Sequence, residues 1–167
     1  PGQKRDRYIE DWEFDLVADM APDYVAVAME LAYLLRARRA EVLALRRDDV
    51  TDAGVYLRRS KGSEDETTTW TPRLRDAVQA ARAVTRDVIS PWLLHCPRGK
   101  PIKAAAFATA WQRLMGKALE SGLKERFTCH DIKAKGITGH NEQRGGHKSE
   151  RMRQIYVRKA PMVEATR

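Results

Sequence analysis

The chain has 167 residues, of which 43% are hydrophobic and 32% are charged, and its formal net charge is +8. This length suits one domain, the composition excludes a disordered chain, and no apolar run approaches the roughly 18 residues that span a bilayer. The two cysteines, Cys96 and Cys129, lack the paired spacing of a disulfide framework or a zinc site. Isolated cysteines favour a reducing, cytoplasmic location.

Positive charge is concentrated in the C-terminal part of the chain. Residues 1–95 contain 15 Lys and Arg against 17 Asp and Glu, whereas residues 96–167 contain 16 against 6. A basic surface attracts phosphate backbones and releases counterions when it binds them. A solvated face that only keeps the protein soluble is the alternative, but the clustering favours a nucleic-acid partner.

Residues 8–160 are predicted to form a single compact α+β domain that is mainly helical, with a loose leader at 1–7 and a tail at 161–167. The spacing of apolar residues, with proline at helix starts, predicts helices over about 8–19, 22–35, 38–46, 72–89, 104–119, 130–139 and 150–156. Between residues 50 and 70, β-branched residues alternate with turn residues, which predicts a small sheet of three antiparallel strands.

Two basic residues in the first half of the chain are candidates for binding a phosphate. Arg38 lies in a strongly basic segment, and Glu41 follows it by three residues, a spacing that can orient the guanidinium. Lys61 lies at the tip of the predicted hairpin, where a flexible lysine can reach a leaving oxygen as a general acid. Considered singly, each is equally explained as an ordinary solvated side chain.

The C-terminal part contributes a row of four further candidates. His130 and Lys133 are three positions apart and share one face of a predicted helix, so both can approach one phosphate. His147 follows two glycines, which allow a close backbone approach. Tyr156 offers a hydroxyl nucleophile if a base or a cationic cluster activates it. A buried histidine, a solvated lysine and a packed tyrosine are the plain alternatives.

In order and spacing, these six residues resemble the catalytic domain of tyrosine recombinases, the phage integrase family. The segment 35–45 is similar to the family's T-G-x-R-x-x-E-x-x-x-L block, with Arg38 as its arginine. The Lys61 hairpin and the following Trp70-Thr71-Pro72 resemble the family's lysine-bearing hairpin and the segment after it. The family's H-x-x-R corresponds to His130-x-x-Lys133, its L-G-H to 145–147, and its tyrosine to Tyr156, nine residues after His147.

The resemblance implies a metal-free mechanism. Tyr156 would attack a DNA phosphodiester and form a 3′-phosphotyrosyl link. Arg38, Lys133 and His147 would stabilise the non-bridging oxygens, and His130 would hydrogen-bond there and assist proton transfer. No cofactor and no metal is implied, because the covalent link stores the energy of the phosphodiester.

The resemblance also implies that Lys61 protonates the departing 5′-oxygen. Double-stranded DNA is the implied partner, with a homotetramer assembling on DNA in the full-length protein, whereas the isolated domain is expected to be monomeric. The chain opens at Pro1, so we expect a fragment of a longer protein that also carries the family's N-terminal DNA-binding domain. No membrane association is expected, and the implied setting is the bacterial cytoplasm, with a prophage as the source.

Three departures from the family pattern leave an alternative open. Arg36 stands where the pattern has glycine, and Lys133 stands where it has a second arginine. The interval from His130 to His147 is 17 residues, which is shorter than the family's usual spacing and predicts a truncated helix between them. A relative that binds DNA without chemistry is therefore the second hypothesis. A metal-dependent nuclease is the third, but Asp48 and Asp49 are better interpreted as a polar turn than as metal ligands.

Overall fold

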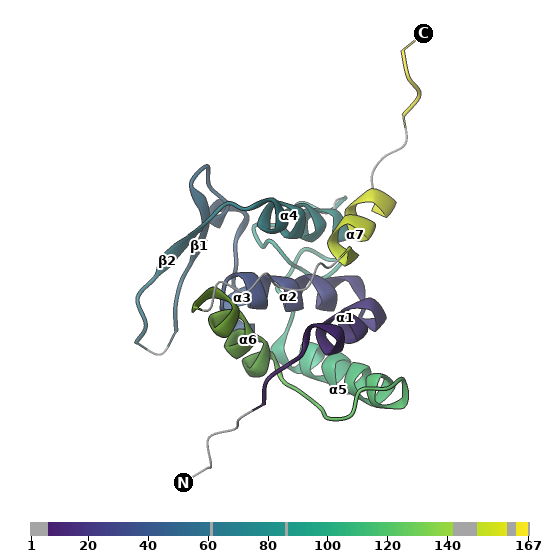
Figure 1. The fold of residues 1–167 in the computed structure, drawn as a ribbon. Helices are drawn as coiled ribbons and strands as arrows, with labels where there is room; N and C mark the ends of the chain where they lie inside the picture. Colours follow the sequence, from purple (N-terminus) through teal and green to yellow (C-terminus); the bar gives the residue numbers. More distant parts are fainter. Residues whose placement is uncertain (1–6, 61, 86, 142–149, 160–162, 167) are drawn as a thin grey trace.

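The computed structural model describes residues 7–60, 62–85, 87–141, 150–159 and 163–166. Its helices pack around α2 (Asp23–Leu34), which is buried from Val25 to Ala32 (Figure 1). All residues of this stretch are apolar except Glu30, whose buried carboxylate pairs with Arg73. The helices in contact with α2 are α1 (Asp11–Met20), α3 (Arg39–Leu43), α4 (Pro72–Val84), α5 (Ala104–Glu120), α6 (Cys129–Asn141) and α7 (Arg151–Lys159). The mainly helical α+β architecture predicted from the sequence is confirmed.

The sheet has two strands, so the prediction of three was wrong. β1 (Gly54–Leu57) and β2 (Glu66–Thr69) run antiparallel, with Gly54 opposite Thr69 and Leu57 opposite Glu66. The expected first strand is reduced to a single bridge between Val50 and Val55. A 3-10 turn (Arg47–Asp49) ends just before Val50, and a tight turn between residues 51 and 54 follows it, so no further residues are free to extend.

Two helices are shorter than their sequence patterns indicate, each for a local reason. The third predicted helix ends at Leu43, because the backbone of residues 45–47 pairs instead with residues 91–93. The helix that begins at Pro72 ends at Val84 rather than near Ile89, since Thr85 leaves the helical region with φ −134° and ψ 49°. The start of this helix is fixed by Thr71, whose hydroxyl accepts the Leu74 N–H at 3.1 Å.

One side of α5 supplies an aromatic wall. Phe107 and Trp111 are one turn apart and stacked, with ring centroids 6.3 Å apart. Trp111 Nε1 donates to the carbonyl of Phe127 at 3.2 Å, which ties α5 to the segment leading into α6. Arg7 supports that segment from the other side, since it donates to the Glu125 carbonyl at 2.8 Å and pairs with Glu13.

α6 is held in place at its start and near its middle. At its start, Thr128 and Asp131 cap each other, with Thr128 N–H donating to Asp131 at 2.8 Å and Asp131 N–H donating to the Thr128 hydroxyl at 3.2 Å. Further along, Gly136 allows close contact with α2, because a Cβ there would lie 2.3 Å from the Tyr33 carbonyl oxygen. The buried Lys135 ammonium donates to the Ile9 carbonyl at 2.9 Å.

None of the helices in the described part of the chain combines the length and apolarity needed to cross a bilayer.

Candidate active site

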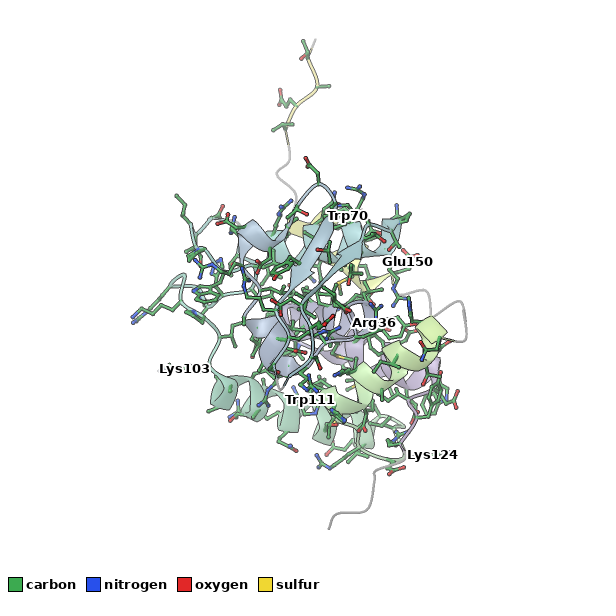
Figure 2. The ribbon with its side chains drawn as sticks, turned by 90° about the vertical axis from the view of Figure 1, so that its left-hand side faces the viewer. Arg36, Trp70, Lys103, Trp111, Lys124 and Glu150 are labelled. Carbon is green, nitrogen blue, oxygen red and sulfur yellow. The ribbon has the colours of Figure 1, made fainter. Side chains whose placement is uncertain are left out.

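A cleft of about 680 Å³ opens between α3, α5 and the start of α6. Its apolar lining includes the aromatic wall of α5, formed by Phe107 and Trp111, and Phe127 from the segment that leads into α6. Its cationic and imidazole lining consists of Arg38, Arg39, Arg126 and His130. Figure 2 looks onto the side of the molecule formed by the hairpin, α3 and α6, and places Arg36 and Trp111 near the middle of that side. Such a cleft suits a ligand that combines negative charge with flat apolar groups.

The turn between α2 and α3 positions Arg38 through an unusual backbone conformation at Arg36. Arg36 has φ 51°, in the left-handed region that glycine adopts freely and other residues adopt at a cost of roughly 1–2 kcal/mol. This is the position where the resemblance described above has a glycine, so an arginine here takes over a glycine conformation. The Arg36 guanidinium lies 3.5 Å from Glu66, which fastens the turn to β2.

Replacing Arg36 tests whether the turn is strained. Arg36→Gly and Arg36→Ala both remove the Glu66 contact, so their difference isolates the backbone. We expect the glycine variant to unfold with a free energy about 0.5–1 kcal/mol higher than the alanine variant, since relief of the left-handed strain exceeds the added flexibility of the unfolded chain. Urea titration of both variants measures this, and equal stability would show that the turn carries no strain.

Glu41 is the acid that orients Arg38. Its side chain is 2% exposed, and its carboxylate accepts the backbone N–H groups of Arg38 and Ser60, each at 2.8 Å. Arg38 Nη1 lies 3.5 Å from Glu41, at ion-pair distance, but this buried N–H forms no hydrogen bond with the described residues. The guanidinium is thus held in the cleft with donor capacity left for a ligand.

Arg59 is a member of the site that the sequence patterns did not single out. It pairs with Glu41 at 3.4 Å and with Glu66, and it donates to the Leu35 and Arg36 carbonyls at the end of α2. The alternation along β1 carried a signal for it, because residue 59 falls on the same side as the buried Val55 and Leu57. A basic residue on a buried side requires an acidic partner, and Glu41 is that partner.

His130 and Lys133 lie in the first turns of α6, on the side that faces Arg38. His130 is exposed and lines the cleft with Arg38. Lys133 is half-buried and close enough to Arg38, Glu41 and Arg59 for their charges to act on it. Burial lowers the pKa of the Lys133 ammonium, and Arg38 lowers it further, whereas Glu41 acts in the opposite direction.

The other predicted site residues are placed differently. Lys61 and His147 lie outside the described residues. Tyr156 is half-buried on α7, close to the exposed guanidinium of Arg153, and a hydrogen bond from this guanidinium to the phenol raises the Arg153 pKa. α7 packs against α4 and α2, so in Figure 1 it lies across α2 from α6. The structure therefore brings Arg38, His130 and Lys133 together, and places Tyr156 elsewhere.

α7 is fastened to the α1–α2 corner by two arginines. Arg151 donates to the Ala18 and Ala21 carbonyls and pairs with Asp23 at 3.0 Å. Arg158 pairs with the same carboxylate at 2.5 Å. Asp23 is consequently the common anchor for both ends of α7.

A cysteine thiol also belongs to the cleft. Cys129 lines the cleft, but burial raises the pKa of its thiol to about 11, so the thiolate that a nucleophile requires is scarce at neutral pH. Among the described residues, no three His, Cys, Asp or Glu side chains are grouped so that they could hold a metal ion.

Comparison with known proteins places the fold. No family model and no curated protein matches this sequence. The lambda integrase catalytic core superposes with a TM-score of 0.66 at 15% identity, over 82% of this chain and 88% of that one. XerA recombinase superposes with a TM-score of 0.69 at 16% identity, over 98% of this chain and 68% of that one.

A lambda integrase tetramer bound to a Holliday junction also matches, with a TM-score of 0.67 at 14% identity. That match covers all of this chain and 51% of the lambda integrase chain, so this chain spans about half of the longer protein. Identities at this level establish the architecture alone. The chain has the fold of the tyrosine recombinase catalytic core.

Proposed function

We propose that this chain is the catalytic core of a site-specific recombinase that cuts and rejoins DNA through a covalent phosphotyrosine. The observation that carries the proposal is that Arg38 and His130, from two separate elements, line one cleft, with Lys133 close enough to Arg38 for their charges to interact, within this fold. Such a group of cationic and imidazole donors suits a phosphate that gains negative charge in its transition state.

The proposed reaction is an in-line displacement at a DNA phosphate. The Tyr156 oxygen attacks phosphorus, the bond to the 5′-oxygen breaks, and a 3′-phosphotyrosyl link forms. Arg38, Lys133 and His147 supply positive charge around the phosphate, and the exposed imidazole of His130 is the candidate acceptor for the phenolic proton. Attack by the 5′-hydroxyl of another strand reverses the step, so the scheme uses neither ATP nor a metal ion.

The departing 5′-oxygen requires a proton, and the resemblance offers Lys61 for this role. We further propose double-stranded DNA as the partner, because lambda integrase has been solved both as a dimer on a core site and as a tetramer on a Holliday junction. By analogy, a longer protein containing this chain would assemble as a homotetramer on DNA, whereas the isolated core is monomeric. The setting would be the bacterial cytoplasm.

Substitution of Tyr156 tests the proposal directly. Purified protein is incubated with nicked duplexes whose central bases are randomised, so that a cleaved strand diffuses away and traps the covalent complex. We expect wild type to form a denaturant-resistant adduct in the presence of EDTA, and Tyr156→Phe to form none, because the attacking oxygen is missing. DNA binding should be retained and should weaken steeply as salt rises.

Tyr24→Phe is the matched control, since Tyr24 is a half-buried tyrosine outside the site. It should form as much adduct as wild type. An undiminished adduct from Tyr156→Phe would refute the assignment of the nucleophile.

A DNA-binding relative without chemistry is the second candidate function. Lys133 favours it, because an ammonium cannot make the planar, two-pronged contact to a phosphate that a guanidinium makes. In that case wild type binds DNA without forming an adduct, and Lys133→Arg restores none.

A further inference from the structure

We propose that Lys133 donates the proton to the departing 5′-oxygen during strand cleavage, rather than acting only as a fixed positive charge. This inference rests on the function proposed above and assigns a chemical role to the residue that departs from the expected pattern. Three features support it: the rigidity of the helix that carries Lys133, the lack of a committed partner for its ammonium among the described residues, and the chemistry of lysine compared with arginine.

The backbone that carries Lys133 is firmly positioned. Thr128 and Asp131 cap the start of α6, and Gly136 lies against α2 on the same helix. Because Lys133 lies between these two fixed points, its first side-chain atoms have little freedom to move relative to Arg38. The ammonium at the end of the flexible stem retains enough freedom to reach a bridging oxygen.

The Lys133 ammonium has no committed partner among the described residues, since it forms neither a hydrogen bond nor an ion pair with any of them. Lys135, two positions along the same helix, is the contrast: its ammonium donates to the Ile9 carbonyl at 2.9 Å and to Asp11 at 2.6 Å. Lys135 is therefore structural, whereas Lys133 keeps its donors for a ligand.

Burial is the main cause that favours release of the Lys133 proton, and charges of both signs face its ammonium. Arg38 from the turn before α3 and Arg59 from the end of β1 repel the ammonium, and Glu41 of α3 and Glu66 of β2 attract it. Both carboxylates are already engaged by arginines, Glu41 by Arg59 and Glu66 by Arg59 and Arg36. The exposed imidazoles of His130, three residues before Lys133, and of His140, seven residues after it, lie on the same side of α6.

Lysine and arginine differ in what they can give a leaving group. An arginine stays protonated at every accessible pH and can only stabilise charge. A lysine can transfer its proton when burial and neighbouring cations disfavour its charged form. In the proposed step, the bond from phosphorus to the 5′-oxygen breaks while the bond to the Tyr156 oxygen forms. The 5′-oxygen takes a proton from Lys133 Nζ, which becomes a neutral amine, and religation returns that proton.

Sulfur substitution at the scissile position distinguishes proton donation from charge stabilisation. Two substrates are synthesised with the DNA sequences recovered from wild-type adducts. One has oxygen and the other has sulfur as the bridging 5′ atom. A thiolate leaves without being protonated, since a thiol has a pKa near 8.5, so sulfur removes the need for a proton donor. Wild type, Lys133→Arg, Lys133→Met and Lys61→Met are compared on both substrates.

We expect both Lys133 variants to cleave the oxygen substrate at least about 100-fold more slowly than wild type, and the sulfur substrate within a few-fold of it. Wild-type cleavage of the oxygen substrate should also fall as pH rises through the Lys133 pKa, because the protonated form is required, and the sulfur substrate should lack this decline.

Three results would overturn the assignment. One is a Lys133→Arg variant as fast as wild type on oxygen, which would show that charge is enough. Another is a Lys133→Met variant equally slow on both substrates. The third is a rescue by sulfur confined to Lys61→Met, which would make Lys61 the donor. Failure of the proposed function itself is distinct, since wild type would then form no adduct with either substrate.

Discussion

Gly136→Ala should both destabilise the protein and impair the site. The added Cβ would lie 2.3 Å from the Tyr33 carbonyl oxygen and 3.3 Å from Arg36 Cγ. The first of these is a backbone atom that no side-chain rotation can relieve, so α6 must move away from α2. We expect the free energy of unfolding to fall by about 1–3 kcal/mol, as for other overpacked contacts.

The displacement of α6 from α2 also carries His130 and Lys133 away from Arg38. Arg38 lies in the turn that follows α2, so it does not move with α6. Misplacing reacting groups by about 1 Å can slow catalysis on the order of 100-fold, so adduct formation should fall by that factor. Urea unfolding and the rate of adduct formation on nicked DNA measure the two effects.

Gly116→Ala is the internal control for this substitution. Gly116 is also in a helix, α5, but a Cβ there would meet nothing within 4 Å. Alanine should therefore stabilise the protein by about 0.5–1 kcal/mol through helix propensity, with adduct formation unchanged. If both variants behaved alike, the close contact between α6 and α2 would not be a constraint on the site.

Glu41→Gln should produce the largest loss of stability. The substitution leaves Arg38 and Arg59 facing each other without the buried carboxylate, and the new amide N–H₂ opposes the N–H groups that Glu41 now accepts. Removing one partner of a buried ion pair typically lowers stability by about 3–5 kcal/mol. Glu64→Gln, at an exposed position between β1 and β2, should change stability by less than about 0.5 kcal/mol.

The pH dependence of stability provides an independent check on Glu41. Burial raises its pKa, but the N–H groups of Arg38 and Ser60, with the charges of Arg59 and Arg38, outweigh burial and set the pKa below its ordinary value. Since the folded pKa is the lower one, Glu41 stabilises the fold above the ordinary pKa and ceases to do so as pH falls through the folded value. The stability difference between wild type and Glu41→Gln should therefore shrink as pH falls below the ordinary glutamate pKa of about 4.3 and toward the lower folded value; a constant difference would contradict this.

Local patterns predicted the elements well, because helix periodicity and capping act over a few residues. The Arg38–Glu41 pair was predicted for the same reason, since three positions on a short helix bring two side chains together. The pattern around Val50 was misleading, as a lone β-branched residue between two turns has no room to form a strand. The partnership of Arg59 with Glu41 joins residues 18 positions apart, so it became visible only when the chain was folded.

The anchoring of α7 has a kinetic consequence. If Tyr156 supplies the attacking oxygen, then protein molecules with α7 docked on Asp23 are a resting population, and cleavage proceeds from a second population in which Tyr156 has reached the cleft. The observed rate is then the intrinsic rate multiplied by the fraction of the second population. Each contact that Arg151 and Arg158 make with the α1–α2 corner biases that fraction, and a bias of about 1.4 kcal/mol changes it tenfold. Bound DNA can raise the rate by preferring one population over the other, without touching the reacting groups.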